Sequence, residues 1–360
     1  MLARLENHPQ RRDMGRVFQL SKGCSPCPHT MTELQKFLFE GLPVRGAIVR
    51  VQAPWQQVLE RRAANTETGA YPPAVSRLLG EMVAAGLLMQ ANIHFEGSLI
   101  LQIQGDGPVR LAVAEVDSSL RLRATAQLAA DAAQSLAADA SLPAMLDAHG
   151  QGRCAITLDA GEKRPGQQAY QGIVALRDAQ GQSLPSLSAV LQQYMQQSEQ
   201  LDTVIVLAAN EQVAAGLLVQ RIPIKGQGNL AGQQHDTQTQ DALGANEDFN
   251  RIATLAASLK TEELLELDVA TILRRLFWQE TLQAIDTEGA TPHFACQCSR
   301  ERVANMLRGL GQEQVQPMLE ENGKPLEIGC EFCGAQYAFD AVDIGHLFAP
   351  LAAEAQQGLH

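Results

Sequence analysis

The chain has 360 residues with a formal net charge of −12, and 45% of its residues are hydrophobic but only 4% are aromatic. This length allows two or three domains with aliphatic, alanine-rich cores. The acidic balance argues against nucleic acid and anionic membranes as partners, and no apolar run reaches the ~18 residues that a membrane-spanning helix requires.

The N-terminal stretch differs from the rest of the chain. Residues 1–30 are polar and irregular, so we interpret them as a disordered extension or a mis-assigned start. They carry charges but no apolar core of a signal peptide, so we expect the chain to reside in the reducing cytoplasm. In that compartment, clusters of cysteines are more often metal or redox sites than structural disulfides. The C-x-x-C pair Cys24 and Cys27 lacks the flanking strand and helix of a thioredoxin-type motif, so we expect it to be passive.

The sequence pattern of residues 31–224 predicts a core domain that contains both helices and an antiparallel sheet (an α/β core domain). The whole chain is then expected to have an α+β fold. Leu34, Phe37 and Leu38 share one face of a helix that would begin at Met31. Further elements follow from apolar spacing and from turn residues. We expect helices over Pro72–Met89, Ala129–Met145 and Ser186–Gln197, and strands over Ser98–Gln104, Val109–Val116, Leu120–Gln127, Arg153–Leu158, Ala169–Leu176, Thr203–Ala208 and Ala215–Ile222.

Residues 225–290 predict a flexible and helical linker. Gly226–Glu247 is rich in Gln, Gly, Asp, Asn and Thr, the composition of a flexible segment. Short helices are expected over Asp248–Leu259 and Glu262–Leu267, and a clearer helix follows Asp268 as its N-cap. The apolar face of that helix consists of Val269, Ile272, Leu273, Leu276 and Phe277. The pattern fits an ordinary docked helix, and it also fits a face that is covered in one state and uncovered in another.

Residues 291–360 predict a small C-terminal domain built around a turn that carries two cysteines. The expected elements are a helix over Arg300–Leu310 capped by Ser299, a helix over Glu313–Glu321, a strand over Leu326–Ile328, a knuckle over Cys330–Gly334, a strand over Tyr337–Phe339, and a helix that is capped by Asp340 and runs to Phe348.

Four cysteines of this domain carry most of the chemical information in the chain. Cys296 and Cys298 form a C-x-C pair, and Cys330 and Cys333 form a C-x-x-C pair. Two close pairs of thiolates supply a complete tetrahedral ligand set for one Zn²⁺. Such a set leaves no coordination position open for a substrate, so the metal cannot act as a Lewis acid. Either the site is structural, or its sulfurs undergo redox chemistry.

The spacing alone leaves both uses open, and a static structural zinc module is the simpler one. A unit of about 60 residues is only marginally stable by itself, whereas zinc on four thiolates contributes about 10–16 kcal/mol in comparable modules. Zinc also keeps its ligand sulfurs as thiolates, the form that oxidants attack. Oxidation would therefore release the metal, melt the domain and free anything docked on it.

Other candidate residues give weaker indications. Cys154 lies in an alternating strand and is expected to be a buried apolar side chain. His293 precedes Cys296 closely, but four thiolates already complete the ligand set. The chain shows no nucleophile elbow or catalytic-triad spacing, and Gly105–Gly107 is a hairpin turn rather than a phosphate loop. We therefore expect neither an enzyme nor a nucleotide site.

The strings CQCSRERVANMLRGLG (Cys296–Gly311) and CEFCGAQYAFDAVDI (Cys330–Ile344) closely resemble the C-terminal zinc module of the bacterial redox-regulated heat-shock chaperone of thirty-three kilodaltons, the HslO family. Similar strings recur in order: FLFEGLPVRG at Phe37–Gly46, FEGSLILQIQGDGPVRLAV at Phe95–Val113, SEQL at Ser198–Leu201, AGLLVQ at Ala215–Gln220 and LKTEELLELD at Leu259–Asp268. The resemblance spans most of Met31–Phe348. Residues 1–30, the long polar stretch and Pro317 depart from it.

The resemblance implies an ATP-independent holdase that is inactive when reduced and zinc-bound. Oxidation would form Cys296–Cys298 and Cys330–Cys333 disulfides, release zinc, and unfold the C-terminal module and the linker. The apolar surface exposed in this way would hold unfolding client proteins, often as a homodimer. The helix after Asp268 lies in the region that the family uses as its sensing linker.

Two other classes of function remain as alternatives. A dithiol oxidoreductase using Cys330 and Cys333 would need an accessible cysteine that is not bound to metal. A zinc ribbon that binds nucleic acid is disfavoured by the acidic charge balance and the few aromatic residues.

Overall fold

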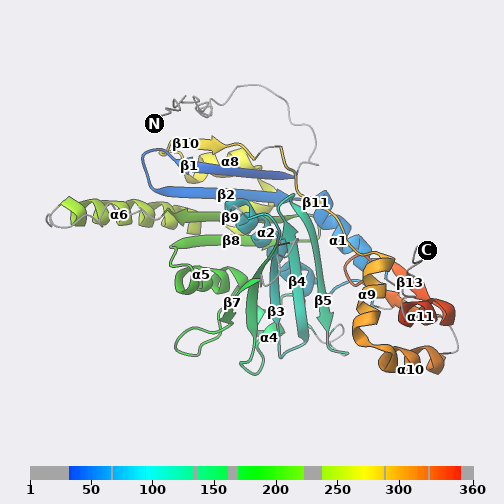
Figure 1. The fold of residues 1–360 in the computed structure, drawn as a ribbon. Helices are drawn as coiled ribbons and strands as arrows, with labels where there is room; N and C mark the ends of the chain where they lie inside the picture. The colour runs from blue at the N-terminus through cyan, green and yellow to red at the C-terminus, as the bar shows by residue number, and fades with distance from the viewer. Residues whose placement is uncertain are drawn as a thin grey trace, which may run out of the picture. The chain divides into compact units, whose positions relative to one another are not determined.

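The computed structural model describes residues 32–349 except 66–67, 94, 131, 133–135, 161–168, 223–236, 288 and 323–324. The fold is α+β with antiparallel sheets, as the sequence predicts (Figure 1). The chain divides into two compact units. The first comprises residues up to Gln57 together with Tyr71–Phe294, and the second comprises Val58–Ala70 together with the residues from Ala295 on. The expectations for residues 1–30, including Cys24 and Cys27, fall outside the described residues.

The first unit contains a five-stranded antiparallel sheet. Its strand order is β10 (Leu282–Ile285), β1 (Glu33–Phe39), β2 (Val44–Val51), β9 (Ala214–Arg221) and β8 (Thr203–Ala209). The two strands predicted near residues 203 and 215 are thus confirmed as β8 and β9.

The helix predicted from Met31 is wrong, because this segment forms strand β1. Both edges of β1 are paired, with β2 on one side and β10 on the other. Phe37 lies opposite Gly46, and a side chain at Gly46 would collide with the Phe37 ring at 2.3 Å. The missing side chain of this glycine lets the ring lie flat on the neighbouring strand. Pairing with distant strands therefore decides the structure of β1, and the helical spacing of its apolar residues does not.

A six-stranded sheet forms the other half of the first unit. Its order is β11 (His293–Phe294), β5 (Arg121–Leu128), β4 (Val109–Asp117), β3 (Ser98–Gln104), β6 (Arg153–Asp159) and β7 (Tyr170–Ala175). The predicted meander and hairpin are confirmed. All of these pairs are antiparallel except that of β11 with β5, which is parallel.

Helix α2 (Pro73–Asn92) contacts strands of both sheets and is buried along most of its length, as expected from its apolar sequence. The other helices that the structure describes before α6 are α1 (Ala53–Ala63), whose residues from Val58 on belong to the second unit, α4 (Leu142–Leu146) and α5 (Leu187–Ser198). None of the helices in the described part of the chain combines the length and apolarity needed to cross a bilayer.

The helix predicted over Ala129–Met145 is wrong over residues 136–141, which are not helical, whereas α4 forms its end; residues 131 and 133–135 lie outside the described residues. Arg77 of α2 donates hydrogen bonds to the carbonyl oxygens of Ala138 (3.3 Å) and Ala140 (3.1 Å). Ala138 and Asp139 form a turn, in which the Ala140 amide donates to the Ala137 carbonyl at 3.1 Å, and the contacts with Arg77 hold this turn against α2. High alanine content favours a helix, but the tertiary contacts of this segment outweigh that preference.

The segment that begins at Thr237 packs on the five-stranded sheet as far as Ile285 and then pairs with the six-stranded sheet through β11. It contains α6 (Thr237–Ala257), α7 (Thr261–Glu266), α8 (Val269–Leu276) and the strands β10 and β11. Of the polar stretch that we interpreted as flexible, the part from Thr237 on is helical, and residues 226–236 lie outside the described residues. The buried side chains of α6–α8 share one hydrophobic cluster with β1, β2, β8 and β9.

The second unit contains the short elements that the sequence predicts. They are α9 (Arg300–Leu310), α10 (Gln312–Asn322), β12 (Leu326–Gly329), β13 (Gln336–Phe339) and α11 (Ala341–Phe348). Ser299 and Asp340 accept hydrogen bonds as N-caps of α9 and α11, and Pro317 lies inside α10. Among the described residues, the hydrophobic core cluster formed by these elements is small, and its buried members are Ala304, Leu307, Val315, Phe339 and Ile344.

Candidate metal centre

Two local structures present the four cysteines. Cys296 and Cys298 lie directly before α9, whose N-cap Ser299 accepts a hydrogen bond from the Arg302 amide. Cys330 and Cys333 lie on the turn between β12 and β13. The Gly334 amide donates to the Cys330 carbonyl at 2.7 Å, and Gly334 has a positive φ of 72°, which closes this turn tightly.

The four sulfur atoms converge on one point. All four Sγ atoms lie within 4.8 Å of one another. The Sγ–Sγ distance is 3.6 Å between Cys296 and Cys330 and 3.2 Å between Cys298 and Cys333. A tetrahedral zinc site with Zn–S bonds of about 2.3 Å places its sulfurs about 3.8 Å apart. The arrangement therefore fits a single ion of this kind. It favours no particular pairing of the sulfurs, because every pair is close.

Two further residues support the cysteines, and sequence reasoning missed both of them. Tyr337 of β13 donates its hydroxyl proton to the Cys298 sulfur at 3.1 Å. Arg300 of α9 donates to the Ala338 carbonyl at 2.5 Å, pairs with Asp343 at 2.7 Å and lies over the Phe339 ring. Arg300 thus ties the segment after Cys298 to the hairpin that carries the other cysteines.

The surroundings of the thiols alter their acidity. Burial acts to raise the pKa of Cys298, but hydrogen bonds from Tyr337 and from the neighbouring thiols outweigh it and bring the pKa to about 7. Burial raises the pKa of Cys330 and of Cys333. A bound cation would stabilise all four thiolates, because metal ligation removes the proton from a coordinating thiol.

This chemistry suits ion binding rather than substrate turnover. Four sulfurs complete a tetrahedron, so a bound ion has no position for a reacting molecule. His293 is not part of the cluster; its ring lies 3.0 Å from the Thr291 carbonyl oxygen. Cys154 is buried in β6, and burial raises the pKa of its thiol to about 12, so it is inert.

The predicted apolar face after Asp268 forms helix α8 in the first unit. Asp268 is its N-cap and accepts from the Thr271 amide at 2.8 Å. The structure buries four of the five predicted residues, and the fifth, Leu276, is partly buried against the same cluster. The buried four are Val269, Ile272, Leu273 and Phe277.

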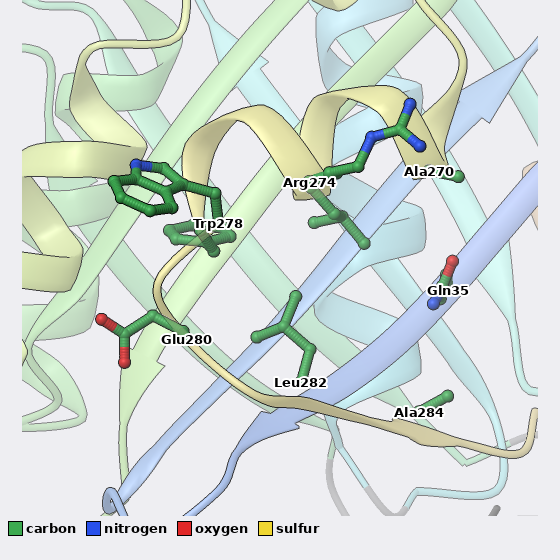
Figure 2. Close-up of a pocket in the computed structure, with 9 residues that line it drawn as sticks. Gln35, Ala270, Arg274, Trp278, Glu280, Leu282 and Ala284 are labelled. Carbon is green, nitrogen blue, oxygen red and sulfur yellow. The ribbon is translucent and has the colours of Figure 1, made fainter. Parts of the chain in front are cut away.

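A small hollow adjoins this helix. Figure 2 shows it between α8, strand β10 and Gln35 of β1, with Trp278 at one end and Ala270 at the other. Its volume is about 200 Å³. Trp278 is 73% exposed, so its indole ring presents apolar surface to solvent. Apolar surface is therefore available beside α8 even while the helix is docked.

Comparisons with known proteins agree with this arrangement. The family model described as Hsp33 protein matches residues 32–340. The chain belongs to the Hsp33 family. It is 42% identical over 316 residues to a 33 kDa chaperonin of Chromobacterium violaceum, covering 88% of this chain and 93% of that one. A 33 kDa chaperonin of Shewanella frigidimarina is 39% identical over 318 residues, with 88% and 95% covered.

A solved structure supports the Hsp33 fold. The crystal structure of the 33 kDa chaperonin from Thermotoga maritima matches with a TM-score of 0.62 and 20% identity, covering 87% of this chain and 97% of that one. Membership of the Hsp33 family makes the protein a chaperone rather than an enzyme. The resemblance inferred from the cysteine strings is thereby confirmed.

Proposed function

We propose that this chain is a redox-regulated, ATP-independent holdase whose second unit is a zinc-dependent switch. In the reduced state, Cys296, Cys298, Cys330 and Cys333 bind one Zn²⁺ as thiolates, and the protein is inactive. The observation that carries the proposal is the convergence of the four sulfurs in a unit whose hydrophobic core cluster, among the described residues, holds five buried side chains.

The oxidation step uses hydrogen peroxide or a comparable two-electron oxidant. Each peroxide takes two electrons from one pair of thiolates and, with two protons from solvent, yields a disulfide and two water molecules. We assign the disulfides to Cys296–Cys298 and Cys330–Cys333, because each pair is adjacent in sequence and stays close after the unit unfolds. Four oxidised sulfurs no longer bind Zn²⁺, so the ion leaves.

Loss of the ion removes the dominant stabilising contribution to the second unit. Structural zinc contributes about 10–16 kcal/mol in comparable small domains. A core of five buried side chains cannot offset the conformational entropy of the rest of that unit. The second unit should therefore unfold when its cysteines are oxidised.

Unfolding passes to the first unit along the chain. The strand β11 ends at Phe294, two residues before Cys296, and β10 and α8 precede it. These elements are short: β11 has two residues, β10 four and α8 eight. Isolated elements of this length are marginal without an anchor. Freeing the end of the segment at Cys296 should let it leave the sheet.

The departing segment would uncover an apolar surface suited to unfolded proteins. Helix α8 and the helices before it cover Phe37, Phe39, Leu217 and Val219 on the five-stranded sheet. Release of α8 would expose these side chains and its own apolar face. We propose that this surface holds unfolding clients without ATP, and that two oxidised copies associate through part of it.

The test measures aggregation of a heat-denatured client enzyme by light scattering, with zinc release followed by a chromogenic chelator. We expect protection only after peroxide treatment, in step with zinc release. The double variant Cys296→Ser, Cys330→Ser should protect without oxidant, whereas Cys154→Ala should behave as the unchanged protein. Equal protection by the reduced protein, or retention of zinc after peroxide, would overturn the proposal. Sedimentation before and after oxidation tests the dimer.

A further inference from the structure

The first unit contains a cavity that the proposed function does not use. Its volume is about 370 Å³, and strands of both sheets line it together with helices α2 and α5. Most of the wall is aliphatic or thioether surface, contributed by Met89, Leu99, Ile156, Leu158, Met195 and Leu218. Cavities of about 300–1,000 Å³ with apolar walls and a few convergent polar groups are the usual form of small-molecule sites.

One cationic group lines this cavity, the half-buried guanidinium of Arg45 on β2. Its Nε donates to the Gln220 side-chain oxygen at 3.0 Å, and its Nη2 donates to the same oxygen. Its Nη1 donates to the Asn92 carbonyl at 3.2 Å. All of these acceptors are neutral. Among the described residues, no carboxylate lies within ion-pair distance of Arg45, which leaves its charge uncompensated.

The neighbours of Arg45 fix the direction of its guanidinium. Gln220 lies opposite Arg45 on β9, and its amide nitrogen donates to the Thr203 hydroxyl at 2.9 Å. The oxygen of this amide is therefore turned toward Arg45. The Asn92 carbonyl belongs to the last turn of α2. Because a guanidinium has five N–H donors and three are used here, N–H groups on Nη1 and Nη2 remain for a ligand.

A half-buried cation with only neutral partners favours an anionic ligand. Burial lowers the pKa of Arg45, which shows that the charged form is held away from water at a cost. A carboxylate would compensate this charge and could accept two parallel hydrogen bonds from the guanidinium. The aliphatic walls favour a ligand whose remaining part is apolar.

The mouth of the cavity limits the charge of the ligand. Glu199 is exposed there and accepts hydrogen bonds from the hydroxyls of Tyr170 (3.1 Å) and Tyr194 (2.8 Å). Its negative charge would repel a second anionic group of a bound molecule. A ligand with one carboxylate therefore fits better than a dicarboxylate or a phosphate ester.

We propose that this cavity binds a small apolar monocarboxylate, such as a medium-chain fatty acid. The carboxylate would lie on Arg45 and the hydrocarbon part against the aliphatic walls. The cavity lies wholly in the first unit, so binding requires neither the metal nor oxidation.

The first experiment is calorimetry on the reduced full chain with decanoate and decylammonium below their micellar concentrations and with decanol below its solubility limit. We expect saturable binding of one decanoate per chain. Decanol should bind about tenfold more weakly, which corresponds to about 1.4 kcal/mol, and decylammonium should not bind. Equal affinities for decanoate and decanol, or no saturable binding of decanoate, would overturn the proposal. Because the protein stays reduced, failure of the redox mechanism would not alter these results.

Two variants locate the site. Arg45→Gln should remove the preference for decanoate over decanol, whereas Arg110→Gln, which changes an exposed arginine on β4, should keep it. Leu158→Trp should fill the cavity and weaken decanoate binding at least tenfold while leaving Arg45 in place. If Arg45→Gln does not fold, decanoate binding by Leu158→Trp and the affinities of the unchanged protein for the three ligands test the proposal. Unchanged decanoate binding by Leu158→Trp would place the ligand elsewhere and refute the assignment.

Discussion

The two units of this chaperone gain their stability in different ways. In the first unit, one cluster alone contains 18 buried hydrophobic residues from α6–α8 and the five-stranded sheet. The core of the second unit contains five, and its four cysteines converge beside them. Hydrophobic burial needs no metal, and aliphatic side chains do not react with mild oxidants, so the first unit should respond to oxidation only through the segment from α8 to β11 that leads into the second unit. The second unit depends on sulfur chemistry, so its stability should follow the redox state.

Removal of the metal is the most direct test of this difference in stability between the two units. Chelation, or the substitution Cys330→Ser, should cost the second unit about 10–16 kcal/mol of binding free energy and unfold it, while residues 71–222 of the first unit remain folded. Hydrogen exchange would show this as loss of protection in 300–348 with protection kept in 71–222. Cys154→Ala is the matched control. Cys154 is buried in β6 and lies outside the cysteine cluster, so this variant should retain the metal. Persistent protection of α9 and α11 without metal would contradict the contrast between the units.

A second substitution tests the contact between α8 and the sheet. Phe277 is 2% exposed, and its ring meets that of Phe39 edge-to-face at a centroid distance of 5.0 Å. Phe277→Ala should cost about 3–5 kcal/mol. We expect α8 to lose protection and the reduced protein to hold clients while its metal stays bound. Client aggregation and metal content, measured on the same sample, check this.

The neighbouring residue gives a matched control for this substitution. Trp278 is 73% exposed, so Trp278→Ala should change stability by no more than about 0.5 kcal/mol and leave the reduced protein inactive. If Phe277→Ala also leaves the reduced protein inactive, release of α8 is not the activating step.

The sequence predicted the features that depend on near neighbours. The cysteine pairs, the caps Ser299 and Asp340 and the meander from Ser98 to Leu128 are all set by residues a few positions apart, and all are confirmed. The convergence of the four sulfurs could be predicted because each pair lies on one short segment, and four thiolates have few uses other than binding one ion.

The features that were missed depend on contacts between distant segments. Strand β1 requires pairing with β10, which lies far along the chain, and the course of Ala138–Ala140 depends on Arg77. Tyr337 reaches Cys298 only through the register of the β12–β13 hairpin, in which Tyr337 lies opposite Ile328. Periodicity and spacing carry no information on such contacts, which explains why the supporting residues of the metal site were not identified.

Tyr337 allows a finer test of the metal site. Its hydroxyl donates to the Cys298 sulfur at 3.1 Å, and loss of such supporting hydrogen bonds typically lowers metal affinity about 10–100-fold. Tyr337→Phe should therefore bind zinc more weakly and release it at lower peroxide concentrations, without unfolding the metal-bound unit. Competition with a chromogenic chelator measures the affinity. Tyr170→Phe removes a hydroxyl in the first unit and should leave zinc affinity unchanged. Equal affinities of both variants would show that the hydrogen bond is incidental.

The smallest expected effect concerns the start of α8. Asp268 accepts from the Thr271 amide and hydroxyl, both at 2.8 Å. Burial acts to raise the pKa of Asp268, but these hydrogen bonds lower it overall. A lowered pKa means that the cap stabilises the helix above the ordinary Asp range and that this contribution is lost as the pH falls through the lowered value. Acid should therefore weaken α8 at its N-terminus.

Two substitutions at this position separate the cap from the charge. Asp268→Ala should cost about 1 kcal/mol at neutral pH, whereas Asp268→Asn keeps a side-chain acceptor and should cost little. Neither variant can titrate, so the loss of α8 protection in acid should be smaller in both than in the unchanged protein. Acid also protonates the zinc ligands, but this affects all three proteins equally and cancels in the comparison. Hydrogen exchange of the α8 amides against pH gives the result. If α8 loses the same protection in acid in the unchanged protein and in both variants, the charge of Asp268 does not contribute to the stability of this helix.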